Sequence, residues 1–173
     1  MPEDLEFVEE RPSDVDAVDQ LTADAFGQPL ESQLVQALRR NGGLTLSAVA
    51  RLAGIPIAHV GYSPLQVGGQ STSPPVLALA PVSVAPQHQR RGHGSALIRW
   101  SLDLLKSRGC PAVIVLGEPA FYSRFGFHAA SDFSIHCPFE VPGEYFMALE
   151  LGQGALRNVS GRVENRPEFD AVC

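Results

Sequence analysis

Residues 82–97 read VSVAPQHQRRGHGSAL, and no other part of the chain says as much about its fold. A β-branched run ends at Pro86, a polar and basic turn follows, and an amphipathic segment begins at once. This order predicts a strand that leads directly into a helix. The first turn of such a helix presents backbone N–H groups that have no partner within the helix, at the positive end of its dipole. Because Arg90 and Arg91 lie beside those amides, the turn is expected to bind an anion, and phosphate is the usual one.

The composition predicts one globular domain in the cytoplasm. The chain has 173 residues, of which 45% are hydrophobic and 18% charged, as in a folded soluble protein. We expect a domain over residues 1–151 and a tail over residues 152–173 that packs on it or extends it. No apolar run could cross a bilayer, and the start MPED is acidic where a secretory signal is basic, so we expect no membrane partner. Cys110, Cys137 and Cys173 are odd in number and lack C-x-x-C spacing, so neither disulfides nor a metal site is expected.

The charge pattern excludes one class of partner and leaves two interpretations of the N-terminal region. A net charge of −6 argues against a nucleic-acid partner, which needs a basic face. Ten of the nineteen acidic residues lie between Glu3 and Glu31. The favoured interpretation is a solvated acidic helix face, and the alternative is a region that attracts a cationic acceptor.

Hydrophobic periodicity predicts an α/β (α+β) fold. Predicted strands cover residues 5–10, 44–51, 55–63, 76–84, 112–116, 131–135 and 144–151. Predicted helices run from an N-cap at Ser13 to a break at Gly27, and over residues 31–40, 92–108 and 120–125. Residues 66–75 and 137–143 are expected to be loops. This order of elements indicates one mixed sheet with helices on both faces.

Two motifs carry a resemblance to a known family. The sequence QRRGHG at residues 89–94 is similar to the Gln/Arg-x-x-Gly-x-Gly/Ala signature of the GNAT superfamily, the acyl-CoA-dependent N-acyltransferases. The sequence FYSRFGF at residues 121–127 resembles that family's Tyr-x-x-x-Gly-Phe element. The residues before it, VLGEP at 115–119, resemble those of the YhbS-like bacterial subgroup. A glycine pair alone is a weak signal, but two motifs in the expected order on the expected elements are specific.

The resemblance implies a single GNAT-like domain with a mixed, mostly antiparallel sheet of six or seven strands. This sheet is expected to splay between its fourth and fifth strands, residues 76–84 and 112–116. The resemblance also implies acetyl-CoA as cosubstrate, with the diphosphate over the amides of the turn and the pantetheine arm on the strand before it. Gln89 is expected either to bond the ligand or to brace the turn, and His93 to face solvent at the start of the helix. The candidate cofactor-binding residues are Val82, Ser83, Val84, Gln89, Arg90, Arg91, Gly92, His93, Gly94 and Ser95.

The implied reaction is direct attack of an amine, on a small molecule or a peptide, upon the thioester in a ternary complex. Tyr122 occupies the family's tyrosine position and is the candidate general acid for the thiolate, since a phenol of pKa about 10 can protonate a thiolate. The alternative role for Tyr122 is packing beside Phe121 and Phe125. Ser123 is a poor nucleophile candidate, because no Gly-x-Ser-x-Gly turn surrounds it.

Two departures from the family pattern leave the acceptor and its base open. Residues 77–81 are wholly apolar where many members carry a carboxylate, and Gly117 begins a Gly-Glu-Pro turn where an asparagine is common. The base is therefore left among Glu31, His59, Glu118, His136 and a bound water. The main alternative function is a CoA-binding regulatory or sensing protein with little turnover. A nucleotide-binding protein of another kind is disfavoured, because neither G-x-x-x-x-G-K-S/T nor G-x-G-x-x-G occurs. A homodimer formed through the last strands is left open.

Overall fold

The structure is a computed structural model, and it describes residues 4–172. The expectations for Met1–Glu3 and Cys173 lie outside the described residues. Seven strands are hydrogen-bonded in the order β1-β2-β3-β5-β6-β9-β7. They are β1 (Leu5–Glu9), β2 (Leu46–Leu52), β3 (Ile55–Pro64), β5 (Leu77–Val84), β6 (Ala112–Leu116), β9 (Phe146–Glu150) and β7 (His128–Ala129). The pair β5–β6 is parallel, whereas β1–β2, β2–β3, β6–β9 and β7–β9 are antiparallel, so the predicted mixed and mostly antiparallel sheet is confirmed.

The chain folds as two compact units. The first comprises residues 4–63, 80–101 and 167–172, and the second comprises residues 64–79 and 102–166. The division falls within β5 and within α3 (His93–Ser107). The predicted splay between residues 76–84 and 112–116 stays a prediction.

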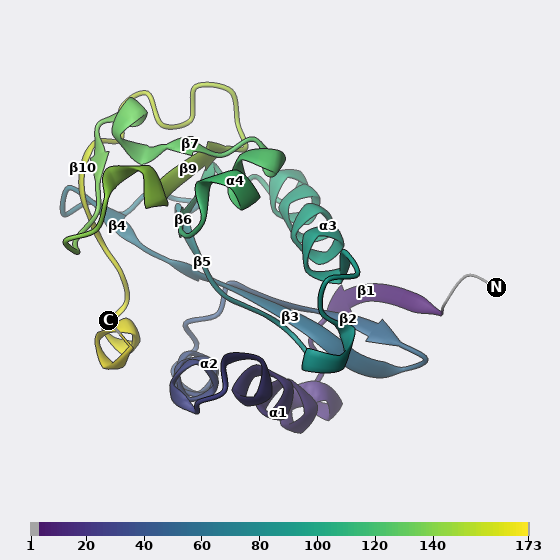
Figure 1. Cartoon of the computed structure of the whole chain (residues 1–173). Coiled ribbons are helices and arrows are strands. Elements are labelled where there is room, and N and C mark those ends of the chain that lie inside the picture. Colours follow the sequence, from purple (N-terminus) through teal and green to yellow (C-terminus); the bar gives the residue numbers. More distant parts are fainter. Residues whose placement is uncertain (1–3, 173) are drawn as a thin grey trace. The chain divides into compact units, whose positions relative to one another are not determined.

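In the first unit, helices cover both faces of the strands. The helices α1 (Val15–Phe26) and α2 (Leu30–Arg40) lie together on one face, and the beginning of α3 lies on the other (Figure 1). On the first face, Thr22 of α1 contacts Ser83 of β5, with 3.0 Å between the two hydroxyl oxygens. On the second face, the ring of Phe7 in β1 stacks on that of Trp100 in α3, with centroids 6.3 Å apart. The predicted arrangement of helices is therefore confirmed in this unit.

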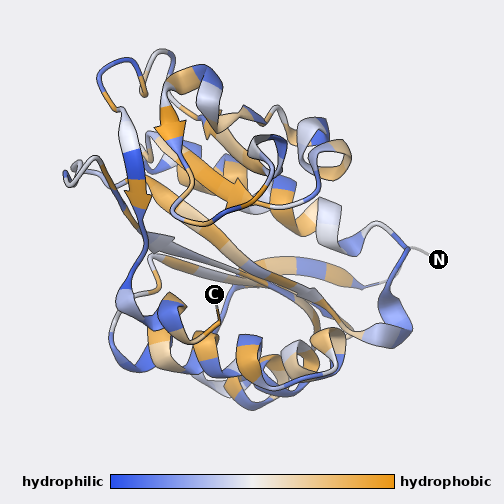
Figure 2. Cartoon of the chain, turned by 60° about the vertical axis from the view of Figure 1, so that its left-hand side comes forward, coloured by the Kyte–Doolittle hydropathy of each residue, from blue (hydrophilic) through white to orange (hydrophobic). Residues whose placement is uncertain are grey.

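The second unit is built around β6, whose first four residues are buried. In β6, Val113 lies opposite Leu149 of β9 and Ile114 lies opposite Ala148. After β6 the chain forms α4 (Pro119–Tyr122) and the short 3₁₀ helices η3 (Ser123–Phe125), η4 (Ala130–Phe133) and η5 (Gly143–Tyr145). A further 3₁₀ helix, η6 (Pro167–Ala171), follows in the first unit. Figure 2 shows the strands mostly in hydrophobic colours, as expected for elements whose side chains form the core.

A small second sheet joins distant parts of the second unit. Its order is β4-β10-β8, with β4 (Gln66–Val67), β10 (Gly161–Glu164) and β8 (Ile135–His136). The expected loop over residues 66–75 therefore contains a short strand, and the expected tail contributes one. The division of the chain at residue 151 stays a prediction.

Two predicted elements are wrong. Ser13 does not cap the first helix, because it lies inside η1 (Pro12–Asp14), and the backbone N–H of Arg11 instead donates to the Asp14 carboxylate across 2.8 Å. The predicted strand at 131–135 is mostly the 3₁₀ helix η4, which ends where Ser134 adopts a left-handed φ of 59°. Because of that turn, Phe133 and Ile135 do not share one face of a strand.

No helix among residues 4–172 is long and apolar enough to cross a membrane.

Candidate functional site

The turn between β5 and α3 is held in shape by its own hydrogen bonds. The short helix η2 (Pro86–His88) follows β5, and the backbone N–H of His88 donates to the carbonyl of Ala85 across 2.8 Å. The side-chain amide of Gln89 donates to the carbonyl of Val84 across 2.9 Å. Of the two roles left open for Gln89, bracing the turn is therefore the one observed in this structure.

Two residues of the turn adopt a left-handed backbone conformation just before the helix begins. Arg90 has φ +64° and Gly92 has φ +82°, after which α3 begins at His93. The first hydrogen bond of the helix runs from Ala96 N–H to the carbonyl of Gly92, at 3.0 Å. The N–H groups of residues 93–95 precede that bond, so by position they have no acceptor within the helix.

The positive charges beside those amides are not neutralised. Arg90 and Arg91 are exposed, and neither forms an ion pair within residues 4–172. Gly94 brings the start of the helix close to the end of the strand, since a Cβ there would lie 3.2 Å from a methyl of Val84. The arrangement suits a bound diphosphate, which requires several N–H donors and nearby cations.

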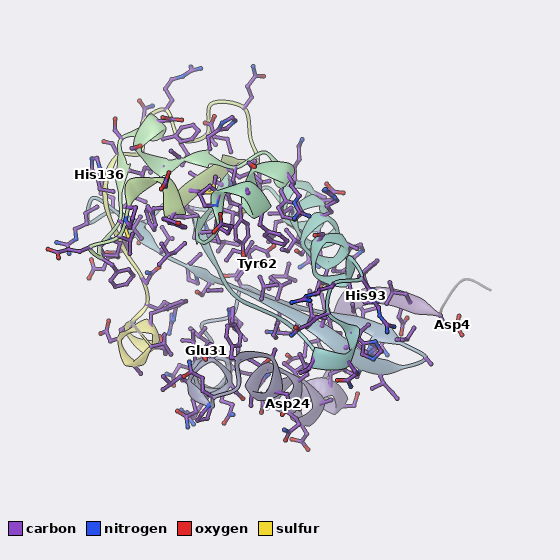
Figure 3. The ribbon with its side chains drawn as sticks, in the orientation of Figure 1. Asp4, Asp24, Glu31, Tyr62, His93 and His136 are labelled. Atoms are coloured by element: carbon purple, nitrogen blue, oxygen red, sulfur yellow. The ribbon has the colours of Figure 1, made fainter. Side chains whose placement is uncertain are left out.

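His93 does not face solvent, so that expectation is wrong. The residue, labelled in Figure 3, is only 8% exposed. Its ring lies edge-on to that of His88, with centroids 6.2 Å apart. His93 Nε2 and His88 Nδ1 are buried and have no hydrogen-bond partner in the part of the chain that the structure describes. The side chain at the start of α3 therefore packs back onto the turn.

The polar side chain of the strand that leads into the turn is already bonded within the protein. The Ser83 hydroxyl is buried and already bonded to that of Thr22. Val82 and Val84 are half-buried. All the candidate cofactor-binding residues from Val82 to Ser95 thus come together in the first unit.

Tyr122 lies in the second unit, in a cluster of aromatic rings. Its ring centroid is 4.9 Å from that of Phe121, 6.2 Å from that of Phe125 and 5.7 Å from that of Phe127. Burial raises the pKa of Tyr122 to about 12. Its hydroxyl forms no hydrogen bond with any residue from 4 to 172. The packing expected as the alternative role is present, but it involves the ring and leaves the hydroxyl unused.

The four candidate bases lie at separate places. His59 is fully buried, and burial lowers its pKa to about 4, so the imidazole is neutral near pH 7 but is closed to a substrate. Glu31 on α2 accepts a hydrogen bond from Gln28 across 2.9 Å. Glu118 is the exposed N-cap residue of α4, and His136 is exposed on β8. No contact joins any two of these side chains within the described residues.

A buried polar network surrounds His59, and it was not predicted from the sequence. His59 Nε2 lies 2.8 Å from the hydroxyl of Ser47, and that hydroxyl donates to the Glu10 carboxylate across 2.9 Å. The Arg39 guanidinium bonds Glu10 across 2.9 Å and Asp19 across 3.2 Å. A histidine within the apolar run of β3 was the only signal in the sequence.

Four acidic residues of the N-terminal region pair with arginines. Glu10 and Asp19 pair with Arg39, while Glu6 and Asp14 pair with Arg51. Other acidic residues face water: Asp24 points away from the sheet (Figure 3). The solvated acidic helix face and the region that attracts a cationic acceptor both stay predictions.

Comparison with known proteins places the chain in a family. The model of the Acetyltransferase (GNAT) family matches residues 15–127. The chain is 35% identical to the uncharacterised N-acetyltransferase YhbS of Escherichia coli K12 over 93% of this chain and 96% of that protein. It is 33% identical to the uncharacterised N-acetyltransferase YjhQ of the same strain over 77% and 75% of the two chains.

Solved structures agree with this placement. The structure of E. coli YhbS in complex with CoA superposes with a TM-score of 0.93 at 33% identity, covering 98% of this chain and 94% of that one. A GNAT family acetyltransferase from Brucella melitensis in complex with acetyl-CoA gives a TM-score of 0.80 at 32% identity, covering 96% and 98%. The chain therefore belongs to the GNAT family of acetyltransferases.

Proposed function

We propose that this protein transfers an acetyl or short acyl group from acyl-CoA to the amine of a small molecule or peptide, by direct attack in a ternary complex. The observation that carries the proposal is the braced turn after β5, with helix-start amides and two exposed arginines. Two similar proteins of about one-third identity have been crystallised with CoA and with acetyl-CoA, which supports a CoA-type cosubstrate.

In this proposal the turn binds the diphosphate of the cosubstrate, and the strand before it binds the pantetheine arm. The N–H groups of His93, Gly94 and Ser95 donate to the diphosphate, and Arg90 and Arg91 add charge-assisted contacts. The main chain of residues 82–84 bonds the amides of the pantetheine arm. Gln89 contributes indirectly, because it fixes the turn to the end of β5.

Tyr122 acts as the general acid in this proposal. When the amine has attacked and the C–S bond breaks, the Tyr122 hydroxyl gives its proton to the leaving sulfur, and solvent then reprotonates the phenolate. A pKa of about 12 keeps the phenol protonated at neutral pH. The same desolvation would raise the pKa of a thiol beside it, so donor and acceptor remain comparable in acidity. The amine loses its proton to water, because residues 77–81 of β5 provide no carboxylate.

That apolar segment of β5 also favours the second candidate, a CoA-binding regulator with little turnover. A thiol-release assay with acetyl-CoA and a panel of polyamines, amino acids, peptide N-termini and lysine peptides separates the two. We expect at least one amine to release CoA thiol, and Tyr122→Phe to lower kcat about 100-fold, within the range for loss of a general acid. Tyr145→Phe, at a half-buried tyrosine of the same unit, is the matched control and leaves kcat unchanged. Binding of CoA without thiol release by any amine supports the regulator, and unchanged turnover in Tyr122→Phe rejects the assigned acid.

A further inference from the structure

Gly117 lies directly after β6, and Tyr122 follows it one short turn later. A Cβ built on Gly117 would lie 2.8 Å from Cδ2 of the Tyr122 ring and closer still to Cε2. Non-bonded carbon atoms prefer about 3.5–4.0 Å, so no side chain fits at this position while the ring stays where it is. The ring of Tyr122 therefore rests on the bare backbone of Gly117.

The backbone of Gly117 has little freedom to move away. Its N–H donates to the carbonyl of Tyr145 across 2.8 Å. On the other side, the N–H of Tyr122 donates to the carbonyl of Glu118 across 3.0 Å. Both partners in the contact are thus fixed through main-chain hydrogen bonds. The conformation of Gly117 is not left-handed, so an alanine there is resisted by the Tyr122 ring and not by backbone strain.

Three aromatic rings pack against the Tyr122 ring. Phe121 lies edge-on to it at 88°, Phe127 at 73°, and Phe125 is tilted at 56°. Phe127 is only 2% exposed, and Phe121 packs in turn against Phe125, with centroids 5.3 Å apart. A ring pushed off Gly117 would have to displace at least one of these neighbours.

The enclosure holds a hydroxyl that has no structural task. The Tyr122 side chain is half-buried, and its hydroxyl has no hydrogen bond with any residue from 4 to 172. A phenylalanine would make the same ring contacts. The tight packing therefore fixes where the hydroxyl points without using it.

We propose that Gly117 is a positioning residue for Tyr122, and that the missing side chain at 117 sets the ring so that its hydroxyl meets the leaving sulfur. This inference rests on the proposed role of Tyr122 as general acid. An alanine methyl would push the ring by roughly 1 Å, and a misplacement of that size can lower a rate about 100-fold. The proton transfer itself is unchanged: the O–H bond of Tyr122 breaks, the S–H bond of CoA forms, and solvent restores the phenol.

The test compares Gly117→Ala with Gly143→Ala in the thiol-release assay. Gly143 lies in the same unit, is not left-handed, and has open space around a Cβ. We expect Gly117→Ala to lower kcat 10- to 100-fold while the KM for acetyl-CoA changes less than threefold, and Gly143→Ala to leave both unchanged. In a Tyr122→Phe background, Gly117→Ala should change kcat less than twofold, because the group that it misplaces is already absent.

The outcomes separate the two proposals. If Gly117 had only a structural role, the fold-losses of kcat in Gly117→Ala and Tyr122→Phe would multiply in the double variant. That result overturns the inference, as does a wild-type kcat in Gly117→Ala. If Tyr122→Phe itself is fully active, the proposed acid fails first. If Gly117→Ala does not fold, a second pair of variants repeats the measurement. The double variant Gly117→Ala/Phe121→Leu is compared with Phe121→Leu alone, because the smaller side chain at 121 leaves space into which the Tyr122 ring can move. The same 10- to 100-fold ratio is expected there, and a ratio of one contradicts the inference.

Discussion

The side-chain amide of Gln89 spans the turn to the carbonyl of Val84, 2.9 Å away, and so joins the two ends of the proposed phosphate-binding turn. Removing this neutral hydrogen bond at an exposed site costs about 0.5–1.5 kcal/mol, which corresponds to a roughly 2- to 10-fold loss of CoA affinity if the turn must be ordered to bind. Gln89→Ala should show that loss by isothermal calorimetry. Gln87→Ala, two residues earlier and exposed, is the matched control, and an equal effect there would contradict the bracing role.

Gly92 provides the second prediction, because its φ of +82° suits glycine and space is open around it. Alanine in that conformation costs roughly 1–2 kcal/mol, so Gly92→Ala should twist the turn and weaken CoA binding about tenfold or more. Gly69→Ala carries a comparable strain, at φ +76° and also with open space, in a loop without a proposed ligand. Both variants should lose similar thermal stability. The account fails if CoA affinity falls equally in both.

The buried pair of Asp14 and Arg51 provides a prediction on stability. Arg51 donates to Asp14 through Nη2, across 2.7 and 2.6 Å, and through Nε across 3.2 Å. Both residues are at most 5% exposed, and the bonds to Asp14 raise the pKa of Arg51. Asp14→Asn leaves the guanidinium charge buried with only a partial partner, so denaturant unfolding should show a loss of about 3–5 kcal/mol. Asp24→Asn, at an exposed carboxylate, should change stability by less than about 0.5 kcal/mol.

His59 makes stability depend on pH. Burial lowers its pKa to about 4 in the folded protein, against 6.5 for the unfolded chain. Between these values the unfolded state takes up a proton that the folded state does not, so this contribution is present above pH 6.5 and is lost as the pH falls through 4. The full loss is about 3 kcal/mol for a shift of this size.

Melting of the wild type and His59→Gln between pH 7.5 and pH 4 tests this linkage. The wild type should lose stability more steeply with falling pH than the variant. His128→Gln, at an exposed histidine, should retain the wild-type slope. Parallel curves for the wild type and His59→Gln would show that His59 titrates normally.

The sequence predicted the elements that depend on local pattern. The strand at 112–116 was predicted to the residue, because a short apolar run lies between a glycine-ended helix and a Gly-Glu-Pro turn. The short helix after Pro119 was also predicted correctly. Turn chemistry and periodicity act over a few residues, so they can be read from one sequence.

Features that depend on distant partners could not be read in this way. The strand β10 forms only because β4 and β8, far away in the chain, present free edges to it. His93 is buried and packs against His88, which its position between two glycines does not reveal. The location in the cytoplasm, the absence of membrane and nucleic-acid partners, and the homodimer remain predictions.

The most direct test of the whole account is calorimetric titration with acetyl-CoA and, in parallel, with acetyl-pantetheine, which lacks the diphosphate and the nucleotide. If the amides of residues 93–95 and the two arginines bind the diphosphate, acetyl-CoA should bind and acetyl-pantetheine should bind at least 100-fold more weakly. Equal affinity for the two compounds, or no heat with acetyl-CoA at millimolar excess, would contradict the account.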